Sequence, residues 1–358
     1  MDDALDLISP TLIIGTGLIG ASIGQALTAR GVAVYLNDIN RENTLIAASR
    51  GAGLVAAPRP TSVKLVVVAV PPAVTAAVVV AALEHYPIAT VLDVASVKSS
   101  VAAAVLASDV PGVERYIGTH PMAGKALAGP LTAVGELFTD RAWAIIPTKL
   151  SSDDAKAQAV RLAFACRARV IELDAESHDR AVAAVSHLPQ LMSSLMAARL
   201  TDCVSDDLLL AGQGVRDVTR IAASDAALWA QIIDGNREPV LAHLRAVAGD
   251  LERLIGTLAA PDAVADLIER GNAGVRALPG KHGRPADELV AVVIEIPDTP
   301  GALARLFRDI EAAGINVEDL SIEHDAVRTV GFLSVHVEPE RADALRQGMR
   351  DNGWEIRA

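Results

Sequence analysis

The 358-residue chain is poor in aromatic residues (3%) and holds only two cysteines. Because hydrophobic residues still make up 51%, a core must be built from Ala, Val, Ile and Leu. Cys166 and Cys203 fit no metal-finger spacing, so neither a disulfide framework nor a structural zinc or other metal site is expected. Basic residues are also scarce, with 32 Lys and Arg against 44 Asp and Glu. A general nucleic-acid binder is therefore excluded, since it would need a basic surface.

A secretory leader and a membrane span are likewise not expected. The N-terminal Met1-Asp2-Asp3 is acidic where a signal peptide is basic, and no long apolar segment follows it. Residues 65–83 carry no charge, but Pro71-Pro72 interrupts them, and the apolar run before this pair has the length of a buried strand. We therefore expect a soluble, cytoplasmic enzyme with no membrane partner.

Short apolar runs alternate with helical stretches over residues 1–150. The runs lie at residues 12–14, 32–36, 65–70, 91–92, 116–118 and 143–146. Uninterrupted apolar strands separated by helices predict a parallel sheet that is covered on both faces. Such sheets bind ligands at the carboxyl ends of their strands. The first 150 residues therefore predict a Rossmann-type α/β domain that binds a dinucleotide.

Residues 151–278 predict an all-helical second domain, after a helix at 153–168 and a short strand at 170–171. Its apolar residues recur at spacings of three and four, at Val182, Val185, Leu188, Leu191 and Leu195, and again from 241 to 254. The first set predicts one buried stripe, within which Pro189 predicts a kink or break. A long helical second domain often supplies the dimer interface of a two-domain dehydrogenase, so we expect a homodimer.

A third module follows a linker rich in Gly and Pro at residues 279–287. Over residues 288–358 the pattern predicts strands at 289–296, from 315 and at 331–337, with helices at 302–314 and 341–352. This βαββα(β) order predicts a small, separate α+β module.

The segment Gly15-Thr16-Gly17-Leu18-Ile19-Gly20 fits the GxGxxG pattern between a predicted strand and a predicted helix. Gly15 allows the tight turn, Gly17 lets a pyrophosphate approach the backbone, and Gly20 lets helix and strand pack closely. The N–H groups that open the helix, at Leu18 and Ile19, would face the phosphates. The alternative is a glycine-rich turn without a ligand.

Asp38 ends the next predicted strand, 18 residues after Gly20. A carboxylate there accepts the two ribose hydroxyls and repels a 2′-phosphate. We therefore favour NAD over NADP as the cofactor, although Arg41 nearby keeps NADP open.

Two polar segments follow predicted strands and should lie at the ligand-binding edge of the sheet. One is Asp93-Val94-Ala95-Ser96-Val97-Lys98, and the other is Gly118-Thr119-His120-Pro121-Met122-Ala123-Gly124. His120 is well placed as an acid or base, because the pKa of a free imidazole is near the working pH. The alternative is a histidine whose hydrogen bonds are satisfied by a turn. Lys98 could contact phosphate or substrate, or be a solvated surface charge.

Residues 11 to about 255 resemble the prephenate/arogenate dehydrogenases of tyrosine biosynthesis. The matching motifs are Gly15-x-Gly-x-x-Gly20-x-Ser22, Asp93-x-x-Ser96-Val97-Lys98, Gly118-x-His120-Pro121-Met122-Ala123-Gly124, His178-Asp179, Ser186-His187-Leu188-Pro189, Gly214-Val-Arg-Asp217-Val-Thr219-Arg220 and Trp229. The C-terminal module resembles an ACT domain, through Asp298-x-Pro300-Gly301-x-Leu303 and Asn316. The order of the motifs makes the resemblance specific.

The resemblance implies an NAD-dependent oxidative decarboxylation of prephenate to 4-hydroxyphenylpyruvate. His120 would accept the proton of the substrate hydroxyl, and Ser96 would help orient both His120 and that hydroxyl. Arg220 would bind a substrate carboxylate, with His187 as a second polar contact and Trp229 shaping the pocket. The plainer alternatives are a core histidine at 187, an ion-pair cluster of Arg216, Asp217 and Arg220, and a core tryptophan at 229.

For the C-terminal module, the resemblance implies regulation. Asp298, Pro300, Gly301 and Asn316 would form an amino-acid site, with tyrosine as a feedback effector. The alternative is a module that only dimerises.

Two positions depart from the family pattern, which commonly has an acidic residue at position 126 and a second histidine at position 190. Here they are Ala126 and Gln190. The first change puts pH response, gating and substrate preference in doubt.

Three other functions remain as alternatives. An arogenate dehydrogenase would run the same ring chemistry on arogenate. A β-hydroxyacid dehydrogenase would share the Rossmann half, but it typically places a catalytic lysine on the helical domain, where this chain has Ser186-His187-Leu188-Pro189 and Arg220. A non-catalytic sensor of nicotinamide and amino acid would have lost His120 or Arg220, yet both are present.

Overall fold

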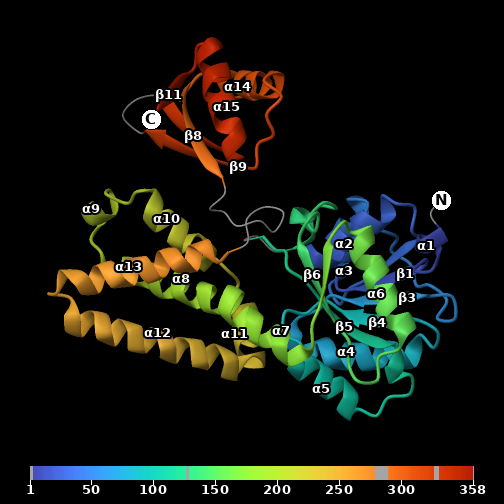
Figure 1. Cartoon of the computed structure of the whole chain (residues 1–358). Coiled ribbons are helices and arrows are strands. Elements are labelled where there is room, and N and C mark those ends of the chain that lie inside the picture. The colour runs from blue at the N-terminus through green and yellow to red at the C-terminus, as the bar shows by residue number, and fades with distance from the viewer. Residues whose placement is uncertain (1–2, 126–128, 279–288, 326–329, 358) are drawn as a thin grey trace. The chain divides into compact units, whose positions relative to one another are not determined.

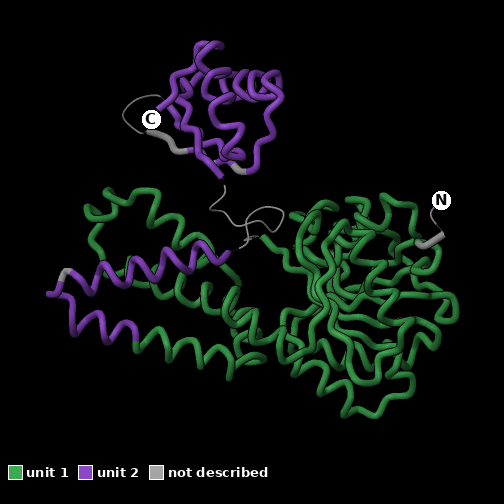
Figure 2. Tube along the Cα trace, in the orientation of Figure 1, with its two compact units in different colours: residues 1–249 green, residues 250–358 purple. Residues whose placement is uncertain are grey.

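A computed structural model describes residues 3–125, 129–278, 289–325 and 330–357 (Figure 1). The chain divides into two compact units, residues 1–249 and residues 250–358 (Figure 2). The boundary falls within helix α12 (Arg237–Thr257), which contributes to both.

The first unit is built on a seven-stranded sheet with the order β2-β1-β3-β4-β5-β6-β7. Its strands are β1 (Thr11–Ile14), β2 (Val34–Asn37), β3 (Leu65–Val68), β4 (Thr90–Asp93), β5 (Tyr116–Pro121), β6 (Ala142–Ile146) and β7 (Arg169–Glu172). The strand order reverses between β1 and β3, which is where sheets of this type bind their ligands. The predicted Rossmann-type sheet is therefore confirmed.

One strand pair departs from the predicted parallel arrangement. β5 and β6 pair antiparallel, with His120 opposite Ala144. The described part of their connection holds only a short 3-10 turn, η2 (Pro130–Thr132), and not the crossover helix that a parallel neighbour requires. His120 also lies within β5 rather than after it.

Helices cover both faces of this sheet, as predicted. α2 (Leu18–Thr28), α3 (Arg41–Ser49) and α6 (Asp153–Ala165) share one buried apolar cluster with Ile13 and Val67. α4 (Pro72–His85) and α5 (Ser99–Ala107) share a second cluster with Leu12 and Val66. Adjacent residues of one strand thus point to opposite faces. The short elements α1 (Asp3–Asp6) and η1 (Val113–Arg115) complete this part.

The domain boundary expected at residue 150 lies too early. β7 pairs with β6, and α6 packs against the apolar cluster of the sheet. The sheet part therefore extends to Glu172. The uncharged stretch at residues 65–83 forms buried β3 and most of α4.

The rest of the first unit is helical. Its elements are α7 (Ala175–Val182), the π-helical turn η3 (Ala183–His187), α8 (Leu188–Arg199), η4 (Leu200–Asp202), α9 (Ser205–Leu208), α10 (Gln213–Thr219), η5 (Arg220–Ala222), α11 (Ala226–Gly235) and the start of α12. Ile232 of α11 joins the apolar cluster that α4 and α5 form on the sheet. The helical elements are thereby fixed to that face.

Pro189 interrupts regular helix geometry, as predicted. It has no N–H to donate, and the π-helical turn directly precedes the helix that contains it. The predicted buried stripe is wrong at two positions, because Val185 is 63% exposed and Leu195 is 56% exposed. The turn breaks the spacing of three and four, so that His187, Gln190 and Ser193 are buried instead.

One continuous helical stretch, Ala175–Asp202, is long and apolar enough to cross a membrane by length and composition alone. Its buried His178 and Asp179 make hydrogen bonds to side chains and backbone of the sheet part. Contacts of this kind are those of a packed helix in a folded domain.

The second unit contains the end of α12, then α13 (Pro261–Arg276), β8 (Val290–Pro297), α14 (Ala302–Ala312), β9 (Asp319–Asp325), β10 (Val330–Val337), α15 (Pro339–Asp351) and β11 (Glu355–Arg357). The strands form an antiparallel sheet with the order β11-β8-β10-β9. Ile294, Leu306 and Leu345 belong to the core between this sheet and its two helices. The predicted α+β module is confirmed, whereas the linker at residues 279–287 lies outside the described residues.

Candidate active site

The glycines that follow β1 each meet a different steric demand. Gly15 has a φ of +97°, and a Cβ there would lie 2.2 Å from the backbone oxygen of Ala69. At Gly20 a Cβ would lie 1.9 Å from the oxygen of Gly15, so the helix approaches the strand too closely for any side chain. Around Gly17, the N-cap of α2, a Cβ would meet nothing within 4 Å. The start of α2, with Leu18 and Ile19, is thus open for an approaching phosphate.

Asp38 is held beside this loop. Its Oδ2 accepts hydrogen bonds from the backbone N of Thr16 at 2.6 Å and from the Thr16 hydroxyl at 3.0 Å. Its Oδ1 accepts one from the backbone N of Asn40 at 2.8 Å. The carboxylate therefore has a fixed position at the carboxyl end of β2, next to the phosphate loop.

A buried ion pair lies at the ends of β4 and β5. Lys98 is 1% exposed; its Nζ pairs with Asp93 and donates to the backbone oxygen of Thr119 at 2.7 Å. The Tyr116 hydroxyl donates to the other oxygen of Asp93 at 2.8 Å. Burial lowers the pKa of Lys98, and Asp93 opposes this effect. Lys98 is thus neither a surface charge nor free to bind a ligand.

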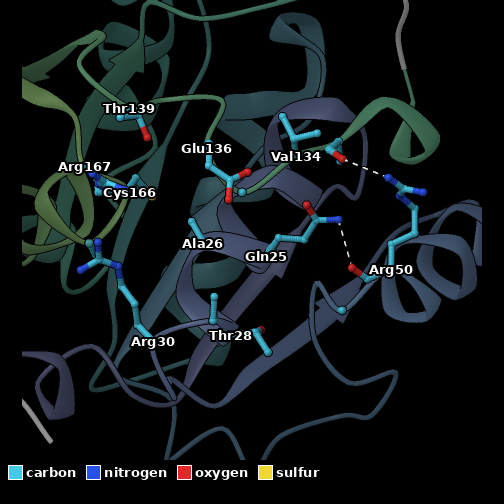
Figure 3. A pocket seen from close by; sticks show the side chains of 15 residues that line it. Gln25, Ala26, Thr28, Arg30, Arg50, Val134, Glu136, Thr139, Cys166 and Arg167 are labelled. Carbon is cyan, nitrogen blue, oxygen red and sulfur yellow. Dashed lines mark hydrogen bonds between the residues drawn. The ribbon is translucent and has the colours of Figure 1, made fainter. Parts of the chain in front are cut away.

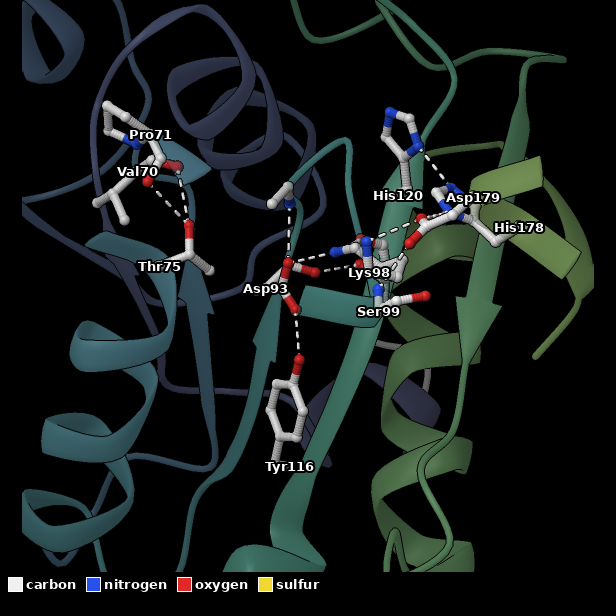
Figure 4. Close-up of polar contacts among 12 residues, drawn as sticks. Val70, Pro71, Thr75, Asp93, Lys98, Ser99, Tyr116, His120, His178 and Asp179 are labelled. Carbon is white, nitrogen blue, oxygen red and sulfur yellow. Dashed lines mark hydrogen bonds and ion pairs between the residues drawn. The ribbon is translucent and has the colours of Figure 1, made fainter. Parts of the chain in front are cut away.

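His120 stands at the head of a chain of hydrogen bonds (Figure 4). Its Nδ1 lies 2.9 Å from Nε2 of His178, and Nδ1 of His178 lies 2.9 Å from Oδ1 of Asp179. Burial, followed by the nearby His178, Lys98 and His187, holds the pKa of His120 well below its ordinary value of 6.5. The imidazole is therefore neutral near neutral pH, and its Nε2 points away from the chain of bonds.

Asp179 is fixed by the first turn of α5. Its two oxygens accept hydrogen bonds from the backbone N of Lys98 at 3.0 Å and from that of Ser99 at 2.8 Å. Burial raises the pKa of Asp179, but the bonds from His178, Ser99 and Lys98 outweigh it and lower the pKa below its ordinary value. The carboxylate is therefore ionised.

Ser96 does not hold His120 in this structure. It is half-buried at the carboxyl edge of the sheet, and among the described residues no hydrogen bond joins it to His120. The residue that contacts Nδ1 of His120 is His178.

His187 lies in the π-helical turn and is 1% exposed. Its Nδ1 is 3.1 Å from Nδ2 of Asn236, which also donates to the backbone oxygen of Asp179 at 2.7 Å. Burial lowers the pKa of His187 to about 4, although Asp179 opposes the shift. The half-buried ring of Trp229 lies edge-on, with its centroid 6.0 Å from that of His187. These two predicted substrate contacts are thus neighbours.

Arg220 is exposed at the start of η5, which packs against α8. Neither a hydrogen bond nor an ion pair joins it to another residue of the described ranges. The expected alternative of an ion-pair cluster is absent from those ranges too, because Asp217 accepts from Gln213 at 2.7 Å instead. The guanidinium is therefore free to take a ligand.

The residues expected to sense an amino acid lie in the second unit. Asp298 and Pro300 are exposed before α14, and Gly301 has a φ of +87° as its N-cap. Asn316 is exposed, and its side chain donates to Glu318 at 2.6 Å. The predicted turn is present, while Ala126 lies outside the described residues.

A surface cavity of the first unit lies at the C-terminal end of α2, whereas the phosphate loop precedes the N-terminus of this helix. Figure 3 shows the residues that line the cavity. It has a volume of about 710 Å³, and Arg30, Arg50 and Arg167 line it beside Glu136. Each arginine follows the last turn of a helix, where a cation offsets the negative end of the helix dipole.

Three residues of the site had no assigned role in the sequence prediction: His178, Asp179 and Asn236. Adjacent His and Asp at the start of a mostly apolar helical stretch were the available signal. Asn236 gave none, because its two partners are 49 and 57 residues away in the chain.

Comparisons with known proteins agree with this geometry. A family model described as "Prephenate dehydrogenase, nucleotide-binding domain" matches residues 23–172, and one described as "Prephenate dehydrogenase, dimerization domain" matches residues 174–269. The probable prephenate dehydrogenase NovF of Streptomyces niveus is 36% identical, over 96% of this chain and 98% of its own length.

Two solved structures resemble this chain. The first is prephenate dehydrogenase from A. aeolicus in complex with hydroxyphenyl propionate and NAD+, which is 25% identical with a TM-score of 0.65, over 74% of this chain and 96% of that one. The second is Synechocystis arogenate dehydrogenase, which is 25% identical with a TM-score of 0.61, over 74% of this chain and 98% of that one.

Proposed function

Because this chain belongs to the prephenate dehydrogenase family and is an NAD-dependent dehydrogenase, we propose that it converts prephenate to 4-hydroxyphenylpyruvate. The observation that carries the proposal is the neutral His120 at the carboxyl edge of the sheet, with Nδ1 bound to His178 and Nε2 without a hydrogen bond to any described residue. A free basic nitrogen in that place suits the removal of a hydroxyl proton.

In the proposed reaction, hydride transfer and removal of the hydroxyl proton precede the loss of CO2. The C4–H bond of the substrate breaks and its electron pair leaves with the hydride. The bound NAD supplies the acceptor for this hydride. The hydroxyl proton passes to Nε2 of His120, and the C–O bond becomes a carbonyl. The carboxylate para to it then leaves as CO2, and its bonding electrons make the ring aromatic. The oxygen takes back the proton from Nε2 of His120 and becomes a phenol.

Arg220, His187 and Trp229 form the proposed substrate contacts. Arg220 offers a planar fork to a substrate carboxylate, and its lack of a partner in the described ranges supports this role. His187 is neutral, since its pKa is about 4, so it would contribute a hydrogen bond rather than a charge. Trp229 would close the pocket beside it, and Ser96 at the same edge would orient the substrate hydroxyl.

The phosphate loop and Asp38 fit NAD. The open start of α2 would hold the pyrophosphate, and a fixed carboxylate would accept the ribose hydroxyls. In Asp38→Ser, the repulsion of a 2′-phosphate is lost, so the ratio of kcat/KM for NAD to that for NADP should fall. An unchanged ratio would contradict the role of Asp38.

Steady-state turnover of prephenate and L-arogenate, each with NAD and with NADP, tests the proposal by following the reduced cofactor. We expect the highest kcat/KM with prephenate and NAD. A higher value with arogenate would favour the second candidate, to which the likeness to Synechocystis arogenate dehydrogenase points. No turnover with either substrate would contradict both.

We further propose that tyrosine inhibits the enzyme through an ACT-like C-terminal module, in a cytoplasmic homodimer. Asp298, Pro300, Gly301 and Asn316 would bind the effector, and the exposed turn before α14 supports this. Inhibition requires tyrosine to bind two states of the enzyme with different affinity. Asp298→Ala should raise the tyrosine concentration for half-inhibition without changing KM. If inhibition is unchanged and competitive with substrate, tyrosine acts at the active site instead.

A further inference from the structure

We propose that His178 and Asp179 are positioning residues, which fix the tautomer of His120 and take up the positive charge that His120 acquires. The proposal rests on the proposed function, and it assigns roles to two buried side chains outside the substrate contacts. Both come from α7, whereas His120 comes from β5.

The chain of hydrogen bonds begins at the carboxylate of Asp179, which has no hydrogen to donate. Asp179 receives the backbone N–H groups of Lys98 and Ser99, at the N-terminus of α5, where the helix dipole also favours a negative charge. The third contact of this carboxylate, with Nδ1 of His178 at 2.9 Å, must therefore be a donated N–H.

This assignment has a consequence for His120. A His178 that carries one ring hydrogen holds it on Nδ1 and has a bare Nε2, which accepts. The atom 2.9 Å away, Nδ1 of His120, must then carry a hydrogen. Neutral His120 is left with a bare Nε2, the nitrogen that lies free of the chain of bonds (Figure 4). The pair thus selects which nitrogen of His120 is the base.

The same contacts provide a path for charge. When the substrate proton arrives on Nε2 of His120, the hydrogen on its Nδ1 can move to Nε2 of His178. His120 becomes neutral again, and His178 becomes an imidazolium that pairs with Asp179. The surroundings of His120 disfavour its cation, because burial, His178, Lys98 and His187 all lower its pKa. Once the charge has moved to His178, it lies against the carboxylate of Asp179.

A structural role alone would be to fasten α7 to α5. Two substitutions at His178 separate these roles, because each keeps one of its two contacts. In His178→Asn the side-chain amide lies where Nδ1 was, so it can donate to Asp179 but no longer contacts His120. In His178→Gln the amide lies where Nε2 was, so it can accept from His120 but no longer contacts Asp179. The exposed His85 supplies a control, His85→Asn.

We expect His178→Asn to lower kcat by about 100-fold, the lower end of what proton transfer contributes. His178→Gln should lower kcat less than His178→Asn does, because its amide oxygen can accept from Nδ1 of His120, although the amide cannot take up the charge. KM and the Kd for NAD should change little in both, and the acidic limb of the kcat profile should move in both. If the two variants lose kcat in proportion to their loss in Tm, the pair only fastens the helices, and the proposal fails.

A second measurement does not depend on turnover. In ¹⁵N-histidine spectra of the wild-type chain, His120 should carry its proton on Nδ1, and in His178→Asn this preference should be lost. A proton on Nε2 in the wild type overturns the inference. If the spectra are as expected and neither prephenate nor arogenate is oxidised, the proposed function fails while the inferred tautomer stands.

Discussion

Asn236 sets the tautomer of His187. One amide hydrogen of Asn236 is donated to the backbone oxygen of Asp179, a group that can only accept, so the bonded atom is the amide nitrogen. Its second hydrogen faces Nδ1 of His187 at 3.1 Å. Nδ1 of His187 is therefore the acceptor, and the ring hydrogen lies on Nε2, where it is available for donation to a substrate oxygen.

Asn236→Asp reverses this contact. A carboxylate accepts where the amide donated, so the proton of His187 should move to Nδ1 and its pKa should rise above the value of about 4. We expect a higher KM with a smaller change in kcat. Histidine titration by NMR, with Asn236→Ala as a control that removes the donor without adding charge, measures the pKa. A pKa that stays near 4 in Asn236→Asp contradicts the assignment.

His120→Asn removes the proposed base and leaves the fold intact. The amide retains a donor near His178 but offers no basic nitrogen, so kcat should fall by about 10² to 10⁴. The Kd for NAD and the Tm should stay close to those of the wild type. A loss of activity that is carried entirely by KM would show that His120 binds the substrate rather than taking its proton.

Arg220→Ala should chiefly raise KM, because the proposed contact is with a substrate carboxylate in the bound state. Losing a hydrogen bond to a charged group corresponds to about a 10- to 100-fold increase. Since the side chain is exposed, the Tm should not change. Arg216→Ala, one helical turn earlier and also exposed, is the matched control. Equal effects of both substitutions on KM would point to general charge and not to a specific contact.

Gly17→Ala should weaken NAD binding, whereas Gly20→Ala should lower the stability of the fold. A Cβ at position 17 meets no atom within 4 Å, so the chain should fold normally and bind NAD more weakly. At position 20 the Cβ would lie 1.9 Å from the oxygen of Gly15, so the chain must shift at a cost of about 1–3 kcal/mol or more. Thermal unfolding and NAD titration of both variants separate the effects. A lower Tm in Gly17→Ala alone would contradict this reasoning.

The free energy of unfolding should depend on pH through His187. Its pKa is about 4 when folded and near its ordinary value of 6.5 when unfolded. Between these two pH values the unfolded chain binds more protons than the folded chain. The contribution of neutral His187 to the free energy of unfolding is therefore fully present above about pH 6.5, and it is lost as the pH falls through 4. His120 acts in the same direction. Urea unfolding of His187→Gln from pH 7 to pH 4 should show a shallower fall than wild type. If the free energy of unfolding falls with pH equally in the variant and the wild type, the lowered pKa of His187 is refuted.

The sequence predicted what depends on local geometry. Gly15 and Gly20 are required by a tight turn and by a close approach of helix to strand, and both demands are local to one strand and the helix after it. The predicted strands and helices of the sheet part follow for the same reason, since each buries an apolar run of its own.

Contacts between distant segments were not predictable in this way. Asp179 bonds to the start of α5, 80 residues earlier in the chain. His178 of the same helix, and not Ser96, is hydrogen-bonded to Nδ1 of His120. Val185 is exposed because a π-helical turn shifts the helix, which a count of three and four does not reveal. The direction of β6 likewise depends on its connection and not on its own residues.

The π-helical turn at Ala183–His187 has the effect of one inserted residue in a helical segment. Deleting Ala184 would restore regular spacing and rotate everything after it by about 100° relative to α7. Gln190 and Ser193 would leave the buried face, while His178 and Asp179 would stay. A single residue of added length thus decouples the two ends of one helical segment, so that each end can present its own side chains to the site.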